Sequence, residues 1–482
     1  MTTRRSLFAL FALIILEGYV VLSSELLAIR MTIPFVGSGT DTVSIIIAAV
    51  LMPLAFGYHA GGRFKPGYRD TWHSGRIYVS VREKLITNML TALIFLLFAI
   101  SYAFLEFFFF GLIDAGLKHR LALITLYSAL FIVTPVYLLG QTIPLTCNFF
   151  TRERLAKATG RILFFSTIGS FLGAVLSTLV LMGQIGVNNT AIVNFVILGL
   201  LITWFSKEWI SIRLILTWAL VIAGIVANSN QAMRNMFIVE NNQYNTIKVR
   251  ELGSDRHMFI NNNASSMYNN DGGKHEYIDF IERVALDPIW NGEEPKDILV
   301  LGAGAFTLGA EDETNIYDFV DIDASLKEIA EERILQRALH DNATFHPMPA
   351  RAFLVETDKK YDVIVLDAYS GGLSLPEHLA TQEFFQQVKD RLKDGGKVLA
   401  NMAVSPNFAS KLSRNIDNTM RSVFPHVSRA VVYENYALWE GGENLISNVI
   451  YIYQHWPDAE NDNEIYTDNK NKVFLDRPAR RP

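Results

Sequence analysis

Long apolar segments fill the first half of the chain and limit what it can fold into. A helix needs about 20 apolar residues to cross a bilayer, because each residue adds only about 1.5 Å to its length. Seven segments come close to this length or exceed it: 6–28, 41–61, 85–113, 121–149, 161–183, 189–206 and 210–228. They predict an α-helical multi-pass membrane bundle of about seven helices over residues 1–230, with the lipid bilayer as its partner.

Two of these segments are longer than one crossing requires. In the third and the fourth we therefore expect tilt or a kink. Pro135 and Pro144 favour a kink in the fourth, because proline removes a hydrogen bond of the helix and clashes with the preceding turn.

Basic residues predict how this bundle is oriented. Cytoplasmic loops of membrane proteins carry an excess of Lys and Arg. Such residues precede the first segment and follow the second and the fourth: Arg4 and Arg5; Arg63, Lys65, Arg69, Arg76, Arg82 and Lys84; Arg152, Arg154, Lys157 and Arg161. The pattern predicts a cytoplasmic N-terminus in the cell (inner) membrane, and seven crossings would place the C-terminal half outside.

Two glutamates and a pair of glycines within the apolar segments suggest further roles for the bundle. Glu17 and Glu25 lie in the first segment. An intramembrane carboxylate is costly, so it is either protonated or paired inside the bundle, or it handles a substrate or ion. Gly169 and Gly173 form a GxxxG pattern in the fifth segment, which suits close helix contact and is compatible with a homodimer.

The charge of the chain changes sign near residues 227–235. Residues 1–230 hold 17 Lys and Arg and 9 Asp and Glu, a net of +8, whereas residues 231–482 have a net of −13. An acidic half argues against nucleic acid and suits a small cationic molecule, although many soluble surfaces are also acidic. The single cysteine, Cys147, excludes an intrachain disulfide and a cysteine-based zinc site, and we expect no metal.

Strand and helix patterns fill the second half. Residues 244–251 and 256–262 alternate in polarity and predict a β-hairpin within region 231–273. From residue 274 to 482, apolar strand patterns such as "DILVLGAG", "IYDFVDID" and "YDVIVLD" alternate with helical patterns. This order predicts a Rossmann-like α/β domain, with a mainly parallel sheet and helices on both faces.

A nucleotide-type site is expected at the carboxyl ends of these strands. "LGAGAFTLG" follows the first strand, so Gly302 and Gly304 would let a ligand approach the backbone. Asp321 ends the second strand, where an acid can hold ribose hydroxyls, and Asp323 joins it in the candidate cofactor set. A phosphate-cradling GxxxxGK[ST] loop is absent from the sequence.

Asp367 ends the fourth strand pattern, directly after four apolar residues. In this topology the fourth strand lies beside the first, so Asp367 would point into the same crevice. The residues that follow it resemble a loop, which argues against a helix-capping role. Asp367 is therefore a candidate general base or cation ligand.

At this point the motifs carry a family resemblance. "YNTIKV", "SSMY", "HEYI", "ILVLGAGA", "VDIDAS", "ARAFL" and "YDVIVLDAYSGG" followed by "PEHLAT" resemble the spermidine synthase family. "SELLAIR", "AFGYHAGGR", "LLGQTIPL" and "GRILFFSTIGSFLGAVLS" resemble the group in which such a domain is fused to a multi-pass membrane region. The resemblance covers most of the chain.

The resemblance implies a polyamine aminopropyltransferase of polyamine biosynthesis. Its co-substrate would be decarboxylated S-adenosylmethionine or S-adenosylmethionine, and its acceptor a small cationic amine such as putrescine. Asp367 would be the base, Asp321 the ribose ligand, and Gly302 and Gly304 the loop under the nucleoside. Glu276 would hold the amine, with Tyr268 and Tyr369 as walls of its channel. Such a donor is cytosolic, so the resemblance favours a cytoplasmic domain while the charge bias favours an outside one; the side stays open.

The sequence also departs from the family pattern. Ala305, Pro349 and the pair Gly371 and Gly372 occupy positions where the family carries acids. Three hypotheses therefore remain. The first is a membrane-anchored aminopropyltransferase. The second is an S-adenosylmethionine-dependent methyltransferase on the same sheet, and the third is a non-catalytic sensor or transporter of polyamines or adenosyl metabolites.

Overall fold

The computed structural model describes residues 4–71, 75–149, 155–208, 210–286, 294–369, 376–432 and 446–456. The chain divides into two compact units. The first comprises residues 1–273, 328–337 and 369–374, and the second comprises residues 274–327, 338–368 and 375–482. The four-stranded sheet of region 231–273 thus groups with the apolar helices, and the second unit begins at Lys274.

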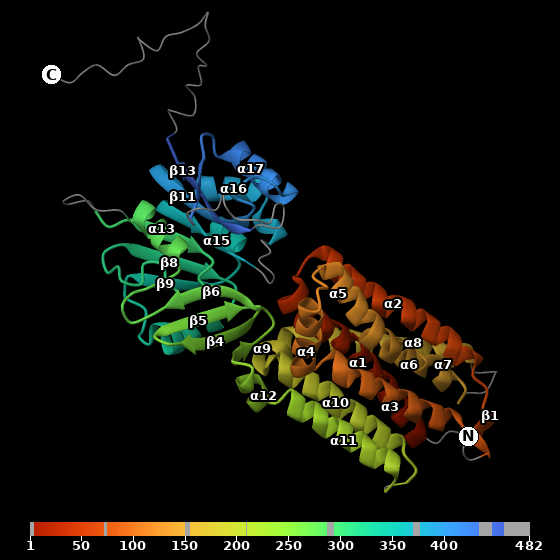
Figure 1. Cartoon of the computed structure of the whole chain (residues 1–482). Helices are drawn as coiled ribbons and strands as arrows, with labels where there is room; N and C mark the ends of the chain where they lie inside the picture. The colour runs from red at the N-terminus through yellow and green to blue at the C-terminus, as the bar shows by residue number, and fades with distance from the viewer. Residues whose placement is uncertain are drawn as a thin grey trace, which may run out of the picture. The chain divides into compact units, whose positions relative to one another are not determined.

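The first unit is a bundle of apolar helices that run back and forth (Figure 1). In chain order they are α1 (Arg4–Val36), α2 (Thr40–Arg63), α3 (Val81–Ala99), α4 (Tyr102–Asp114), α5 (Arg120–Tyr127), α6 (Val133–Gly140), α7 (Thr142–Cys147), α8 (Leu155–Val175), α9 (Met182–Gln184), α10 (Gly186–Phe205), α11 (Ile212–Ala227) and α12 (Asn230–Asn235). A short hairpin of β1 (Gly67–Thr71) and β2 (Gly75–Val79), which the sequence did not predict, follows α2.

The expected count of about seven crossing helices is corrected by the helix lengths. Five described helices are long and apolar enough to cross a membrane, and a bent pair raises the number to six. The pair is α3 and α4, whose axes bend by 61° at the break after Ala99. The segment expected at 210–228 forms α11, whose 16 residues extend only about 24 Å.

The fourth apolar segment is interrupted, as its prolines predict. A π-helical turn (Ser128–Ile132) separates α5 from α6 and ends three residues before Pro135. The chain breaks again at Gln141, three residues before Pro144, and resumes as α7. Proline cannot donate to the turn before it, so the helix changes its winding at these points.

The GxxxG pattern of α8 packs against another helix of the same chain. A side chain at Gly169 would overlap the carbonyl oxygen of Ile15, and one at Gly173 would overlap that of Tyr19. The small residues of α8 therefore let the backbone of α1 approach closely, the packing expected for such a pattern. This face of α8 is covered by α1, so the pattern gives no support to the homodimer that the sequence allowed.

A four-stranded antiparallel sheet is attached to the C-terminal end of α1. Its order is β3 (Ile238–Asn241), β4 (Thr246–Leu252), β5 (Asp255–Ile260) and β6 (Asn263–Tyr268), so the predicted hairpin is its central pair. Arg30 of α1 donates to the Asn242 carbonyl oxygen at 2.9 Å and to Thr246 Oγ1 at 3.2 Å. Buried Lys248 of β4 forms an ion pair with Glu106 of α4. The N-terminus lies at the other end of α1, which is 33 residues long.

The second unit is built on a seven-stranded sheet of order β12-β13-β11-β10-β7-β8-β9. Its strands are β7 (Asp297–Leu301), β8 (Ile316–Asp321), β9 (Ala343–Pro347), β10 (Tyr361–Leu366), β11 (Leu392–Val404), β12 (Ser428–Val431) and β13 (Ser447–Gln454). The run from β11 to β9 is parallel, as predicted, and β13 is antiparallel to both of its neighbours.

Helices connect these strands and cover the sheet. They are α13 (Glu276–Ala285), α14 (Ser325–Ile329), α15 (Ala350–Glu356), α16 (Gln382–Asp390) and α17 (Lys411–Val423). Alternate residues of the strands, such as Ile364 and Leu366, form one core with α15, α16 and α17. The intervening residues Val363 and Val365 are also buried, which explains the unbroken apolar run of β10.

Because α1 and α8 pack so closely, we expect a single methyl group added at their contact to lower the stability of the first unit. Gly169→Ala should destabilise the first unit by about 1–3 kcal/mol, because the obstructing Ile15 oxygen belongs to the backbone and cannot rotate away. Gly160→Ala in the same helix is the control, since no atom lies within 4 Å of its Cβ position. Thermal unfolding of the full chain in nanodiscs measures both. Equal midpoints for the two variants would contradict this packing.

Candidate functional site

Asp367 lies at the carboxyl end of β10, between the ends of β7 and β11. Its backbone N–H donates to the Leu301 carbonyl oxygen at 2.8 Å, which continues the ladder with β7. Tyr277 Oη of α13 donates to Asp367 Oδ2 at 3.0 Å, and Asn401 Nδ2 of β11 donates to Oδ1 at 2.9 Å. Three elements distant in sequence thus fix the position of one carboxyl group.

The surroundings of Asp367 change its acidity. The residue keeps a partial opening to solvent, but the surrounding protein desolvates its carboxyl and raises the pKa to about 7. The hydrogen bonds from Asn401 and Tyr277 lower the pKa and offset part of this increase. Near neutral pH the group therefore both accepts and releases a proton readily, which is the property of a general base.

The glycine loop after β7 packs against the same point. Gly302 has φ of +100°, and a Cβ there would overlap the carbonyl oxygen of Asp367. Gly304 also has a positive φ of +51°. The sequence suggested that these glycines admit a ligand; the structure adds that Gly302 admits the backbone of Asp367.

Asp321 ends β8 and holds the glycine loop from the other side. Its Oδ2 accepts from the backbone N–H of Ala303 at 3.1 Å, and its Oδ1 accepts from that of Asp323 at 3.1 Å. Burial raises its pKa to about 6, against the lowering effect of the backbone N–H groups of Asp323 and Ala303. A carboxylate has about four acceptor positions, and the backbone N–H groups of Ala303, Asp323 and Ile322 use up to three of them, which leaves an acceptor position for a ribose hydroxyl. These residues therefore fit an adenosyl group.

The other candidate residues lie in different surroundings. Asp323 is buried and accepts from Ser325 Oγ at 2.6 Å, which starts α14. Glu276 is exposed at the start of α13, one residue before Tyr277. Tyr268 is buried in β6 of the first unit, and Tyr369 also groups with that unit. The roles of Glu276, Tyr268 and Tyr369 toward an amine stay predictions.

Two residues of the site were missed from the sequence. Tyr277 lies on the buried face of α13, and a buried tyrosine hydroxyl usually has a hydrogen-bond partner. Asn401 interrupts the apolar run of β11 at the register of the β10 end, and it is buried. Both residues gave a weak signal in the sequence, because each places a polar atom at a position where the helix or strand pattern calls for an apolar side chain.

The structure describes two of the three positions at which the sequence departs from the family pattern. Ala305 is fully buried after the glycine loop, and Pro349 precedes the first residue of α15. Gly371 and Gly372 lie outside the described residues. Among the described residues, no group of three or more His, Cys, Asp or Glu side chains is arranged to hold a metal ion.

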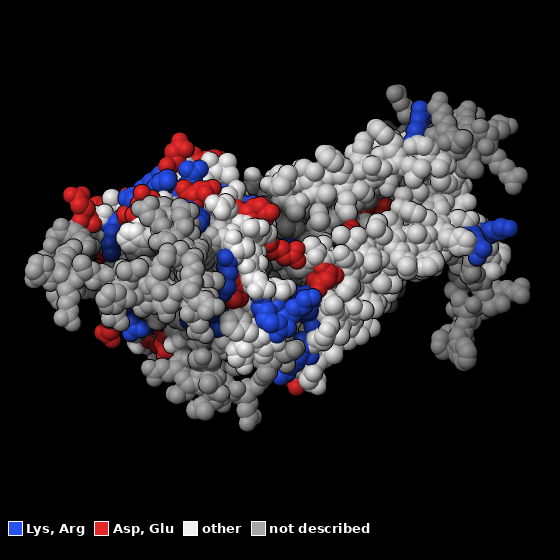
Figure 2. All heavy atoms as spheres, turned by 90° about the horizontal axis from the view of Figure 1, so that it is seen from above, with Lys and Arg blue, Asp and Glu red and all other residues white. Residues whose placement is uncertain are grey.

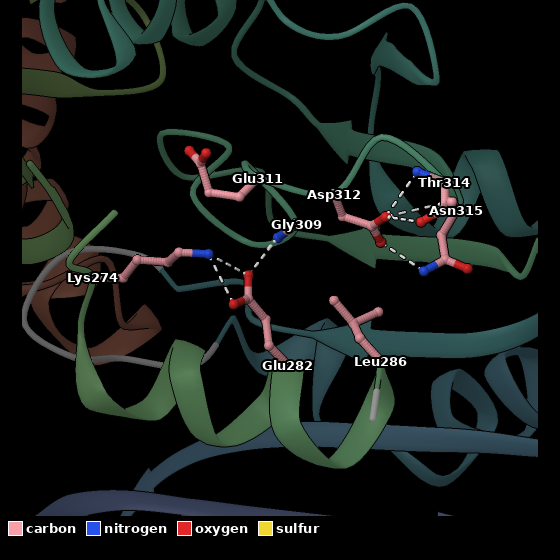
Figure 3. A pocket seen from close by; sticks show the side chains of 8 residues that line it. All are labelled: Lys274, Glu282, Leu286, Gly309, Glu311, Asp312, Thr314 and Asn315. Carbon is pink, nitrogen blue, oxygen red and sulfur yellow. Dashed lines mark hydrogen bonds and ion pairs between the residues drawn. The ribbon is translucent and has the colours of Figure 1, made fainter. Parts of the chain in front are cut away.

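A cavity of about 410 Å³ in the second unit shares no lining residue with this site. Lys274 and Glu282 point toward each other across it, and Glu282 also faces Gly309 (Figure 3). Lys274 Nζ donates to Glu282 Oε1 and Oε2 at 2.6 and 2.8 Å, and the Gly309 N–H donates to Oε1 at 2.6 Å. Glu282 thus joins α13 to the end of the loop that begins at Gly302.

Comparisons with known proteins match the C-terminal part of the chain, and one relative extends into the apolar first half. The family model described as "Spermine/spermidine synthase domain" matches residues 279–437. A polyamine aminopropyltransferase of Oceanobacillus iheyensis is 26% identical over 381 residues, 72% of each chain. One of Vibrio vulnificus is 31% identical over 165 residues, 33% of this chain and 52% of that protein. A solved structure of a probable spermidine synthase from Corynebacterium glutamicum has a TM-score of 0.38 and 20% identity, covering 48% of this chain and 82% of its own.

Because the pKa of Asp367 is raised, the stability of the second unit should depend on pH in a defined direction. Between about pH 4 and pH 7 the unfolded chain loses a proton that folded Asp367 keeps, so this group lowers stability as the pH rises. Asp367→Asn should therefore stabilise the second unit by up to about 4 kcal/mol at about pH 8 and change little near pH 4. Thermal unfolding at the two pH values is the measurement, with exposed Asp358→Asn as the control. A destabilised Asp367→Asn at pH 8 would contradict it.

Proposed function

The C-terminal part of the chain carries a spermine/spermidine synthase domain, as its motifs predict, and on this premise we propose that the protein is a membrane-anchored aminopropyltransferase. The family model and the curated relatives indicate a transferase of the polyamine aminopropyltransferase type. The proposed donor is decarboxylated S-adenosylmethionine, and the proposed acceptor is a small primary amine.

The proposed reaction needs one proton acceptor. A protonated amine cannot attack, so the ionised carboxylate of Asp367 accepts a proton from the amine nitrogen. The freed lone pair forms a bond to the propyl carbon beside the sulfonium, and the bond from that carbon to sulfur breaks. Methylthioadenosine leaves with the electron pair on sulfur, and the proton stays on Asp367 until solvent takes it.

The position and acidity of Asp367 carry this proposal. Its carboxyl lies at the strand ends beside Gly302, is held from two sides by Tyr277 and Asn401, and has a pKa of about 7. Near neutral pH such a group is partly ionised and still basic enough to take a proton. Asp321, next to the same loop, supports an adenosyl donor.

Loss of the base should reduce transfer without loss of donor binding. Asp367→Asn keeps the shape and removes the charge, so turnover should fall by about 10²–10⁴-fold. Wild-type turnover should rise with pH through about 7, because the base works in its ionised form. The measurement is transfer from labelled donor to a panel of amines, read by mass spectrometry, with Asp358→Asn as the control.

Donor binding separates the outcomes of this experiment. Calorimetry with S-adenosylmethionine, its decarboxylated form and methylthioadenosine should detect binding that Asp321→Ala weakens. No binding of any of the three at millimolar concentration would refute the proposal. Methylated amines as products would favour a methyltransferase. Donor binding without any transfer would favour a sensor, the outcome that the missing acids at Ala305 and Pro349 support.

Tyr277→Phe tests how the base is tuned. The variant removes one hydrogen bond that lowers the pKa of Asp367. A hydrogen bond to a charged group contributes about 1.5 kcal/mol or more, so the rise of turnover should move to higher pH by about one unit. Turnover at the alkaline plateau should stay within a few-fold of wild type. An unchanged profile would mean that Tyr277 does not act on the base.

We also propose that the first unit crosses the cell membrane with its N-terminus in the cytoplasm. The basic loops support this orientation. Arg30 and Pro34 near the C-terminal end of α1 contact the four-stranded sheet, so the sheet lies on the face opposite the N-terminus. The second unit follows this sheet directly at Lys274, and the proposal therefore places it outside.

Reporter fusions at the C-terminus test this orientation. Alkaline phosphatase should be active there, and a fluorescent protein that matures only in the cytoplasm should stay dark. The same pair of reporters fused to the N-terminus should give the opposite result. A bright C-terminal fusion would reverse the orientation and place the transferase where its donor is made.

A further inference from the structure

Glu17 is buried inside the helical bundle and has no role in the proposed transfer. It lies near the middle of α1 and is 3% exposed. No hydrogen bond or ion pair joins it to any described residue of the chain, although its charge acts on Tyr58 of α2. The next basic residue along α1 is Arg30, about 20 Å farther on, and it is bound to the sheet. A carboxylate so placed lacks a counter-charge.

Polar groups continue along the same face of α1. Ser24 lies seven residues after Glu17, two helical turns along, and therefore on the same face. Asn194 of α10 donates its Nδ2 to Ser24 Oγ at 3.1 Å. Its Oδ1 is buried and has no hydrogen-bond partner in the described structure. A buried acceptor without a donor is costly, so it favours an occupant that brings positive charge or a proton.

The bundle is also irregular beside this face. Ser23 of α1 bonds to Ser177 at 2.7 Å, and Ser177 lies in a π-helical turn (Leu176–Leu181) after α8. Such turns are rare and frequently occur at functional sites. Figure 2 shows acidic side-chain atoms recessed in a groove of the helical part, whose visible surface there is otherwise uncharged. Three acids lie well inside the apolar segments, Glu17, Glu25 and Glu106, and Glu106 forms an ion pair with Lys248.

We propose that the first unit binds a small monovalent cation at Glu17. The ligand is an alkali-metal ion or a protonated amine, with the single charge that one carboxylate neutralises. Asn194 of α10, which bonds to Ser24 two turns along α1 from Glu17, offers its unpartnered Oδ1 as a second acceptor, and the proposed path of the cation runs between the two groups. Intramembrane acids that face a bundle interior commonly mark such paths.

The chemistry of the site excludes two other occupants. A divalent metal would need several anionic or carbonyl ligands, whereas no cluster of three acidic, His or Cys ligands occurs among the described residues. A structural salt bridge would need a Lys or Arg beside Glu17, and no ion pair of Glu17 occurs among them either. Cation binding at Glu17 involves the first unit alone and does not depend on the transfer reaction.

Labelling with dicyclohexylcarbodiimide tests the proposal on the full chain in nanodiscs. This apolar reagent modifies protonated carboxyl groups in apolar surroundings, and a bound cation competes with the proton. Sodium, potassium and methylammonium are added in separate arms, with choline at equal ionic strength as the control. A cation at about ten times its dissociation constant leaves about one tenth of the sites free, so labelling of Glu17 should fall about tenfold.

Variants supply a second readout. The cation that protects Glu17 should raise the thermal unfolding midpoint of wild type and of exposed Asp114→Asn, but not that of Glu17→Gln. Protection by sodium or potassium identifies an alkali-metal site, and protection by methylammonium identifies an amine site. Equal labelling of Glu17 in all four salts would overturn the proposal, because a protonated structural acid behaves in that way. The wild-type labelling decides the matter even if Glu17→Gln fails to fold.

Discussion

The candidate site of the second unit depends on one steric constraint, the approach of the Gly302 backbone to the carbonyl group of Asp367. Any side chain at Gly302 would separate the glycine loop from the end of β10. Asp321 fixes the same loop through the N–H of Ala303, and Glu282 fixes its far end through the N–H of Gly309. Two carboxylates thus hold the loop in place while a third, Asp367, stays available for chemistry.

Asp367 shows how stability and activity compete at such a site. Its desolvation raises the pKa, so ionisation at neutral pH works against the folded state. Tyr277 and Asn401 reduce that cost and fix the orientation of the carboxyl group. A fully solvated aspartate would be stable but too weak a base for an amine, whereas an apolar pocket without these donors would keep the proton.

The sequence predicted those features that depend on local pattern. The apolar run of β10, the glycines after β7 and the acid after β8 are read from neighbouring residues, and the parallel order of the central strands follows from their alternation with helices. Tyr277 and Asn401 were missed because their contacts with Asp367 span 90 and 34 residues. The helix count was too high because hydropathy does not detect the bend after Ala99 or the short length of α11.

The attachment of the four-stranded sheet determines where the chain can be divided. Residues 231–273 look from the sequence like the start of a soluble domain, yet Thr246 and Lys248 are buried through contacts with Arg30 and Glu106 of the helices. A fragment that begins at residue 231 would expose these polar groups and a lysine without its counter-charge. The sheet is therefore a layer of the helical unit, which also takes in residues 328–337 and 369–374, so no single cut in the chain separates the two units.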